Sequence, residues 1–451
     1  MKFINREREL EAIKEKLNSE NFEFYVIYGR RRIGKTALSL ISVKNKKAIY
    51  YLATEENNLR RFKEVASKLI PEVKYAEEDL EAIFSFLKNK TIIIDEFPNL
   101  IKENPKVVSE MQRIIDLVLR ETKTKLVILG SSISMMESKV LSYRSPLYGR
   151  KTGQIKLKPL KFSQMRKFFP KASAERAVEI FGFADGVPFY LEKTKYPFWK
   201  YLDKELKSVD SFLKTEVDFL MKYEFSETRT YKKILEAIAL GNTKSGEIKN
   251  QIGFKKTDIT PYLKNLIETE FIERDVPLLE SAKSRKGRYY IKDNFVNFWF
   301  KFIYPNRSFM EEGIFSAGEI KEKYNAYLGF VFEKICREFL IEKRKKLPVN
   351  FSKIGRQWGA IPGAEKRKNQ YEIDLLALND KTKQIIFIEC KWQNLRKGQA
   401  RNILEELREK SGVIEWNNKK RKEYFCLMAK KIENKKELRK EGFLVFDLED
   451  F

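Results

Sequence analysis

The feature that most constrains the fold is a glycine-rich loop near the amino terminus. An apolar run, 24–28, is followed by Gly29-Arg-Arg-Arg-Ile-Gly34-Lys35-Thr36, a GxxxxGK(S/T) pattern that leads into a helical segment. In such a loop backbone N–H groups wrap phosphates, the lysine reaches the β and γ oxygens, and the threonine hydroxyl ligates Mg²⁺. A chance glycine-rich turn is the alternative, and the strand-loop-helix context argues against it. The loop therefore predicts ATP and Mg²⁺ binding by Gly29, Arg30, Arg31, Arg32, Ile33, Gly34, Lys35, Thr36 and Ala37.

The residues around this loop alternate short apolar runs with stretches of helical period. The expected strands are 24–28, 48–52, 91–95, 126–129 and 154–157. This alternation is typical of an α/β domain built on a parallel sheet. We expect a nucleotide-binding core at 1–162 and a helical lid at 163–225.

The composition excludes several kinds of catalytic and metal-binding site. The 451 residues include no histidine, which excludes Ser-His-Asp triads, Cys-His pairs and histidine-ligated metal sites. The three cysteines lie far apart in sequence and form no CxxC pair, so a zinc or thiol-disulfide centre is not expected. Carboxylates, hydroxyls, lysines and hard cations remain. With few cysteines and no apolar signal core at the start, we expect a cytoplasmic protein without a membrane segment.

Two carboxylates end the run at 91–95. Asp95 would hold Mg²⁺ through water, and Glu96 would orient and deprotonate the water that attacks ATP. Taken alone, an Asp-Glu pair after a strand is more often a solvated turn, but the phosphate loop favours the catalytic interpretation. Ser131, after the run at 126–129, is either a γ-phosphate sensor or a routine turn residue. Arg150 is either a charge-neutralising arginine finger or a surface arginine.

Several segments together resemble a known family. They are FINREREL, YGRRRIGKT, IIIDEFPNL, LGSS, SPLYGRKTG and GVPFY, and they are similar to the archaeal P-loop ATPases related to STAND and origin-initiator ATPases. The resemblance covers about the first half of the chain. It implies that Asn5, Arg6 and Glu7 lie near the adenine and that Pro188, in the lid, closes over the base.

Residues 226–293 have the outline of a winged helix-turn-helix. Three helices are expected at 231–240, 245–252 and 257–269, followed by a hairpin with a basic loop. Basic residues at the start of the third helix and on the wing would contact DNA phosphates, giving recognition by shape and charge. They are Lys255, Lys256, Lys264, Lys283, Arg285, Lys286 and Arg288. Protein docking is the alternative use of this unit.

The last part, 294–451, carries a second group of carboxylates. Strands are expected at 371–378 and 384–391, after a helix near 327–343. Glu389 and Lys391 share one face of their strand because side chains alternate along a strand, and Asp374 on the neighbouring strand can meet them. Two carboxylates would then bind a divalent cation while Lys391 stabilises charge on a phosphate.

This second pattern resembles the core of the PD-(D/E)xK nucleases, which are often fused to these ATPases. The resemblance implies a further acid on the helix, for which Glu333 is the best match, and Gln399 is a weak match to a later motif. The pattern is loose, so a degenerate nucleic-acid-binding remnant stays open beside a metal-dependent nuclease. Basic clusters at 343–346, 366–368 and 419–422 surround it.

The net charge of +26 favours a polyanionic partner, with DNA first. The sequence thus predicts an ATP-hydrolysing switch that acts on DNA and carries a Mg²⁺-dependent nuclease domain. A DNA-bound ATPase regulator with an inactive nuclease-like domain, or a defence or signalling ATPase triggered by a protein, is the alternative. A homo-oligomer or a protein partner is also possible on this sequence.

Overall fold

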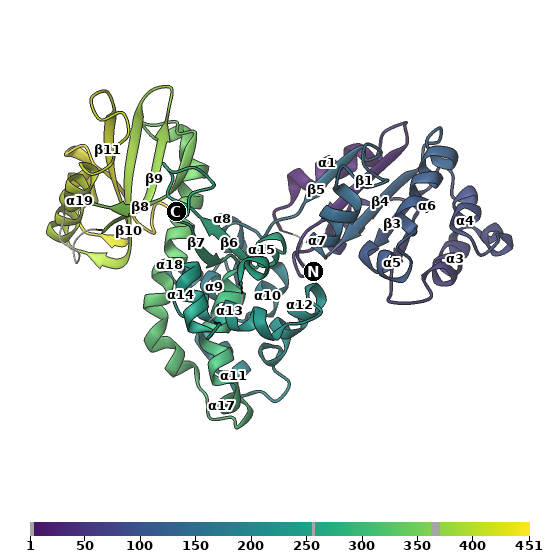
Figure 1. Cartoon of the computed structure of the whole chain (residues 1–451), viewed down its shortest axis with the longest axis horizontal. Helices are drawn as coiled ribbons and strands as arrows, with labels where there is room; N and C mark the ends of the chain where they lie inside the picture. Colours follow the sequence, from purple (N-terminus) through teal and green to yellow (C-terminus); the bar gives the residue numbers. More distant parts are fainter. Residues whose placement is uncertain (1–3, 255–257, 362–369) are drawn as a thin grey trace.

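The computed structural model describes residues 4–254, 258–361 and 370–451. Two sheets lie at opposite ends of the molecule, with a helical region between them (Figure 1). The first sheet comes from the amino-terminal third of the chain and the second from the carboxyl-terminal quarter.

The first sheet confirms the predicted parallel architecture. Its order is β2-β3-β4-β1-β5, and all of its pairings are parallel. The strands are β1 (Glu23–Tyr28), β2 (Ala48–Leu52), β3 (Thr91–Asp95), β4 (Lys125–Gly130) and β5 (Gly153–Lys156). The strands β1 and β3 are both parallel to β4, which lies between them. Their carboxyl ends are therefore at the same edge of the sheet, and the loop after β1 lies near the carboxylates at the end of β3.

Side-chain alternation along β1 explains why both faces of this sheet are covered. Phe24, Val26 and Tyr28 face one core, and Tyr25 and Ile27 face another. The second core takes in α1 (Glu7–Leu17) and α2 (Lys35–Ser42), and the first takes in helices after β2 and β3. Those helices are α3 (Asn58–Leu69), α4 (Leu80–Phe86), α5 (Phe97–Glu103) and α6 (Val107–Arg113), while a short α7 (Ile133–Met135) follows β4.

The segment predicted as a lid is helical throughout. It contains α8 (Phe162–Met165), α9 (Ala174–Ala184), α10 (Pro188–Lys193), α11 (Phe198–Lys207) and α12 (Glu216–Glu224). Pro188 is the first residue of α10, where its missing N–H costs no helical hydrogen bond.

Three helices and a hairpin follow in the predicted order. They are α13 (Arg229–Ala239), α14 (Ser245–Gln251), α15 (Thr260–Glu268), β6 (Ile272–Asp275) and β7 (Arg288–Ile291). The strands β6 and β7 pair antiparallel. The predicted basic start of the third helix, Lys255 to Thr257, lies outside the described residues.

The carboxyl-terminal sheet has the order β12-β11-β10-β9-β8. β9 and β10 pair antiparallel as predicted, whereas β11 joins β10 in parallel after a crossover through α19. The elements are α16 (Asn294–Phe298), α17 (Arg307–Glu311), α18 (Ala317–Lys343), β8 (Lys353–Ala360), β9 (Gln370–Asn379), β10 (Gln384–Leu395), α19 (Lys397–Ser411), β11 (Lys422–Ile432), α20 (Lys435–Lys440) and β12 (Leu444–Phe446).

One hydrophobic core runs across the predicted boundaries at 225/226 and 293/294. It contains lid residues such as Phe183, the junction residues Phe295 and Trp299, Phe332 of α18, and Ile388 of β10. The opposite face of the carboxyl-terminal sheet packs on α19 in a separate core. The lid, the three-helix unit and α18 are therefore packed as one body.

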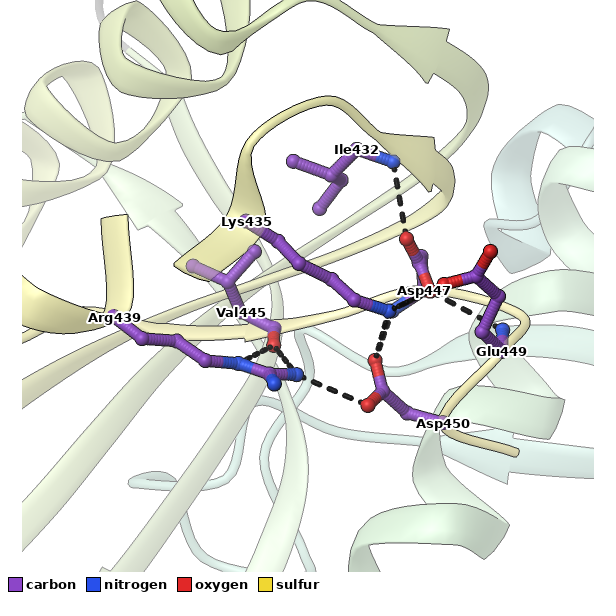
Figure 2. Close-up of polar contacts among 7 residues, drawn as sticks. All are labelled: Ile432, Lys435, Arg439, Val445, Asp447, Glu449 and Asp450. Carbon is purple, nitrogen blue, oxygen red and sulfur yellow. Dashed lines mark hydrogen bonds and ion pairs between the residues drawn. The ribbon is translucent and has the colours of Figure 1, made fainter. Parts of the chain in front are cut away.

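The end of the described chain is tied down by a charged network. Lys435 Nζ lies 2.6 Å from Asp447 and 3.1 Å from both Glu449 and Asp450, and Arg439 bonds the Val445 carbonyl and Asp450 (Figure 2). This holds the segment after β12 against β11, where the Phe451 ring stacks on Phe339 of α18 at 4.4 Å. Within the described parts of the chain, no helix is long and apolar enough to cross a membrane.

Candidate functional site

The loop between β1 and α2 has a backbone that only glycines allow. Gly29 has φ of +143° and Gly34 has φ of +90°, both in regions that side chains rarely adopt. A Cβ at Gly29 would also lie 2.4 Å from the Leu157 carbonyl oxygen. The two glycines therefore fix a loop that curls at the carboxyl end of β1, with α2 starting at Lys35.

Lys35 is buried inside this loop. Its Nζ donates to the carbonyl oxygens of Gly29 at 3.0 Å and Arg30 at 2.9 Å. Burial lowers the pKa of Lys35 to about 8, although the charges of Glu96 and Asp95 act in the opposite direction. A bound phosphate would give the Lys35 ammonium a negatively charged partner in place of two neutral carbonyl oxygens. The site therefore favours an anion.

The Asp95 carboxylate at the end of β3 is buried and faces α2. Its Oδ2 accepts hydrogen bonds from Thr36 Oγ1 at 2.6 Å and from Tyr50 OH at 2.9 Å. Hydroxyl and carboxylate oxygens are the donors that Mg²⁺ prefers. Thr36 and Asp95 thus have the chemistry and the proximity that the predicted Mg²⁺ site requires.

Glu96 follows directly in a left-handed conformation, with φ of +53°. Its Oε1 accepts from Ser131 Oγ at 2.6 Å, and its Oε2 accepts from Tyr223 OH at 2.9 Å. Ser131, at the end of β4, therefore contacts the predicted catalytic carboxylate.

Helix α12 contacts the phosphate loop and the residues that follow β3 and β4. Glu216, at its start, binds Arg32 through two contacts of 3.1 Å, and Tyr223 lies under the guanidinium of Arg31. At its end the Glu224 carboxylate accepts from Ser132 Oγ at 3.1 Å. Burial raises the pKa of Glu224.

Arg30, the first arginine of the loop, contacts a more distant part of the chain. Its Nη1 lies 2.8 Å from the buried carboxylate of Asp293, the N-cap of α16. The side chains of Arg30 and Arg32 thus bind carboxylates, while the backbone N–H groups of the loop are the groups predicted to wrap phosphates.

The residues implied for the adenine lie beside the loop. Arg6 Nη2 donates to the Lys158 carbonyl at 2.6 Å and to that of Ile33 at 3.5 Å, and the Pro188 ring lies 3.9 Å from a Cβ built at Gly34. Asn5 is also buried, but Glu7 is exposed at the start of α1.

Arg150 lies at the opposite edge of the sheet. Tyr25 of β1 pairs with Gly153, so residue 150 precedes the amino end of β5, whereas the loop follows the carboxyl end of β1. Arg150 instead binds Asp116 through contacts of 2.6 and 2.9 Å. The structure does not bring Arg150 to the phosphate loop of its own chain.

The second site is centred on β9 and β10. Asp374 Oδ2 accepts from the Cys390 N–H at 2.7 Å, and Lys391 Nζ lies 2.6 Å from Glu389 Oε1. Burial, reinforced by the charges of Glu389 and Glu333, raises the pKa of Asp374 to about 7. Although burial opposes it, the hydrogen bond that Lys391 donates to Glu389 raises the pKa of Lys391.

Glu333 comes close to this group but has a different partner. Its Oε2 accepts from Arg356 of β8 at 2.7 and 3.0 Å. Burial raises the pKa of Glu333, against the charge of Arg356. Among the described residues, no three or more acidic or cysteine side chains are arranged to hold a metal ion. The predicted trio of Glu333, Asp374 and Glu389 is therefore not assembled in this conformation. Gln399 accepts from the Arg396 N–H at 3.0 Å and caps α19.

The hairpin predicted as a DNA-binding wing is docked on the carboxyl-terminal sheet. Arg288 binds Glu372 at 2.9 Å and stacks on Trp358 at 4.5 Å, and the Leu278 N–H donates to the Arg356 carbonyl at 2.9 Å. Arg288 is thus engaged within the chain. Lys283, Arg285 and Lys286 are exposed, as is Lys264 on α15.

Sequence reasoning missed four residues that shape these sites. Tyr50, Tyr223 and Glu224 contact the nucleotide-site carboxylates or serines, and Arg356 holds Glu333. Tyr50 has a detectable signal, since it sits on the strand next to the one that ends in Asp95. The other three reach the sites from distant segments, and no local spacing points to them.

The sheet order, the glycine-dependent loop and the two acids after β3 define a P-loop ATPase. Residues 3–194 match a family model described as an ATPase domain predominantly from Archaea. Residues 299–403 match a model described as Archaea bacterial proteins of unknown function.

One relative matches this chain over its full length. The Methanocaldococcus jannaschii protein named "Uncharacterized protein MJECL04" is 61% identical over 451 residues, covering all of both chains. The "Uncharacterized ATP-binding protein MJ0423" of the same organism is 44% identical over 45 residues, 10% of this chain and 76% of that one. The chain belongs to the archaeal ATPase family that includes the first of these relatives.

A solved structure supports the fold. The Walker-type ATPase PABY2304 of Pyrococcus abyssi aligns with a TM-score of 0.52 at 20% identity, covering 66% of this chain and 96% of that one. The chain has this fold, and its residues 3–194 form an ATPase domain.

Proposed function

We propose that this ATPase is a nucleotide-dependent switch that acts on DNA through a winged helix and a Mg²⁺-dependent nuclease domain. The observation that carries the nuclease part is the placement of a half-buried carboxylate, Asp374, and a buried one, Glu389, on adjacent strands. Glu389 is 6% exposed, and its Oε2 has no hydrogen-bond partner among the described residues.

A buried carboxylate without a partner is costly unless a cation or a proton neutralises it. Here burial raises the pKa of Asp374 to about 7, and Lys391 and Lys410 both lie beside the same oxygen of Glu389, Oε1, at 2.6 and 3.7 Å. A divalent cation between the two carboxylates would supply the missing charge. This supports a metal site in which Lys391 turns from Glu389 toward a phosphodiester.

The two reactions use similar groups. At the first site Glu96 takes a proton from the water that attacks ATP, and Lys35 stabilises the charge on the phosphates. At the second site Asp374 and Glu389 would hold Mg²⁺, whose charge would polarise the phosphodiester. Lys391 would stabilise negative charge on the phosphate or position the water.

The distribution of charge supports a nucleic-acid partner. The chain carries a net charge of +26, and Lys283, Arg285 and Lys286 are exposed on a hairpin loop docked beside β8 and β9. Exposed lysines and arginines bind phosphates by releasing counterions, so binding should weaken steeply with salt.

One observation favours a second candidate function, a DNA-binding ATPase regulator, or a defence or signalling ATPase, whose nuclease-like domain does not cut. The guanidinium of Arg356 donates to the Glu333 carboxylate. Within the described part of the chain, Glu333, Asp374 and Glu389 do not form a metal-binding group in this conformation. An acid whose charge is already paired with an arginine needs no metal ion to neutralise it.

Cleavage assays distinguish these two functions. Wild type, Lys391→Ala and Lys353→Ala would be tested on single-stranded, duplex and branched DNA with Mg²⁺ or Mn²⁺. Lys353 is a matched control, because it is an exposed lysine of the same sheet paired with Asp380. The proposal expects cleavage by wild type and the control but not by Lys391→Ala. If wild type cuts none of the substrates, the nuclease claim is wrong, and salt-sensitive DNA binding without cleavage would support the regulator.

A further inference from the structure

One oxygen of Glu96, the residue proposed to activate water in ATP hydrolysis, is fully occupied in this conformation. Ser131 Oγ donates to Oε1, whereas Oε2 accepts from both the Tyr223 hydroxyl at 2.9 Å and the Ser131 N–H at 3.3 Å. A carboxylate oxygen accepts two hydrogen bonds, so both positions on Oε2 are filled. If Oε2 is the oxygen that takes the proton from water, the Tyr223 contact must open before hydrolysis.

Of the two partners, Tyr223 belongs to an element outside the sheet. Ser131 is the residue after β4, in the middle of the sheet, whereas Tyr223 lies on α12. The opposite side of α12 is bound to the downstream helices, since Asp218 lies 2.6 Å from both Lys232 of α13 and Arg307 of α17. The position of Tyr223 thus depends on the body formed by the lid and the three-helix unit.

Arg31 links this contact to the phosphate loop. Its guanidinium carbon lies 3.8 Å from the centroid of the Tyr223 ring and 4.7 Å from that of Phe219. Arg30 and Arg32 are each held by a buried carboxylate, but the structure records no carboxylate partner for Arg31 in the part of the chain it describes. Its Nε is buried and makes no hydrogen bond with those residues.

We propose that Arg31 and Tyr223 form a phosphate-sensitive gate on Glu96. An arginine held only by aromatic rings gains more from a nucleotide phosphate than from the rings. When the phosphate takes Arg31, the ring of Tyr223 keeps only one cation among the described residues, Lys102, whose Nζ lies 4.8 Å from its centroid, and the hydroxyl leaves Glu96. Glu96 Oε2 is then free to accept a hydrogen bond from water. Tyr223 is a positioning residue that restrains the resting enzyme.

Steady-state ATP hydrolysis by Tyr223→Phe tests the gate, because this change deletes the hydroxyl and keeps the ring under Arg31. The kcat should rise about threefold to tenfold, since the hydrogen bond that restrains Glu96 is lost from the fraction of ATP-bound enzyme in which the gate is still closed. The KM and the affinity for ADP should stay within about twofold, because the hydroxyl does not contact the phosphate loop.

Tyr201→Phe is the matched control. Tyr201 lies on α11 in the same lid, and its hydroxyl is buried without a hydrogen-bond partner among the described residues. Its kcat should equal that of wild type. A purely structural role for Tyr223 would lower the melting temperature and the kcat together, so an unchanged or reduced kcat in Tyr223→Phe overturns the proposal.

A double-mutant cycle tests the role of Arg31 separately. Arg31→Gln should raise the kcat in the wild-type background, because the ring of Tyr223 then lacks the same cation that a phosphate would draw away. In the Tyr223→Phe background the same change should have a smaller effect on kcat. Equal effects in both backgrounds would show that Arg31 does not act through Tyr223, and would contradict the gate.

Discussion

The two candidate sites contain similar residues but are built in different ways. At the nucleotide site, backbone conformation does most of the positioning, since two glycines with positive φ fix the loop around Lys35. At the carboxyl-terminal site, side chains from α18, β8, β9 and β10 meet. Their orientations are set by ion pairs such as Arg356–Glu333 and Lys391–Glu389. The first arrangement is fixed by local sequence, whereas the second depends on which partner each charge finds.

Two lysines illustrate the difference. Lys35 is buried against carbonyl oxygens, and desolvation lowers its pKa to about 8. Lys391 is half exposed, and the hydrogen bond to Glu389 raises its pKa despite partial burial. Lys35 therefore lacks an anion that a phosphate would provide, while Lys391 already has one and must leave it to contact a substrate.

The largest expected effect tests the first site. Glu96→Gln should retain ATP but lower the kcat by roughly 10²–10⁴-fold, because the amide cannot take a proton from water. Phosphate release and equilibrium ATP binding measure the two quantities separately. Glu121→Gln, at an exposed position, is the control. Normal turnover by Glu96→Gln would mean that another group is the base.

The next effect concerns nucleotide binding. Lys35→Met should weaken ADP and ATP binding on the order of 100-fold, because the neutral side chain cannot contact the phosphates. Lys44→Met, an exposed lysine after α2, should bind normally. Because Lys35 titrates near pH 8, wild-type affinity should also decline above that pH. Affinity that stays level between pH 7 and 9.5 would contradict the buried position of this amine.

At the second site the pH dependence of stability is the test. Asp374 has its pKa raised from about 3.8 to about 7, so the folded chain binds a proton more tightly than the unfolded chain between these values. The free energy of unfolding should therefore fall as pH rises from 4 to 7. Asp374→Asn removes this fall and should be more stable than wild type at pH 8, on the order of 3 kcal/mol.

Denaturant unfolding at several pH values measures this difference. Asp380→Asn is the control, because Asp380 is exposed and its one ion-pair partner among the described residues is Lys353. If the two carboxylates bind a cation, Mn²⁺ at pH 8 should stabilise wild type but not Asp374→Asn. Parallel pH profiles for wild type and Asp374→Asn would show that Asp374 is not held in a buried, acid-lined position.

The smallest effect concerns Arg150. Its side chain binds Asp116 at the edge of the sheet away from the phosphate loop, so Arg150→Ala should change the kcat by less than about twofold in dilute protein. Hydrolysis would be measured over a range of protein concentrations. A large loss of activity that appears only at high concentration would indicate that Arg150 serves the site of a second copy.

The sequence predicted most of the first sheet and its site because each feature there is local. The run 91–95, which ends in Asp95, agrees with β3 to the residue, Glu96 follows it directly, and glycine spacing identified the phosphate loop. Tyr223 was not predictable, since it lies 127 residues from Glu96 and its segment reads as an ordinary amphipathic helix.

The carboxyl-terminal region was predictable only in part. Two apolar runs identified β9 and β10, but β8 contains two glycines, an arginine and a glutamine, and β11 is bordered by lysines. The pairing of Glu333 with Arg356 depends on how α18 packs against β8. Local sequence does not specify a partner of this kind. The prediction therefore placed Glu333 near the site but did not identify Arg356 as its partner.

The most direct test of the whole account asks whether the nucleotide state controls the carboxyl-terminal domain. DNA cleavage would be measured with Mg²⁺ and saturating ATP for Glu96→Gln, which holds ATP, and for Lys35→Met, which does not bind it. The account predicts clearly different cleavage rates for the two variants and no cleavage once Lys391→Ala is added to either. Equal rates, or cleavage that survives Lys391→Ala, would contradict it.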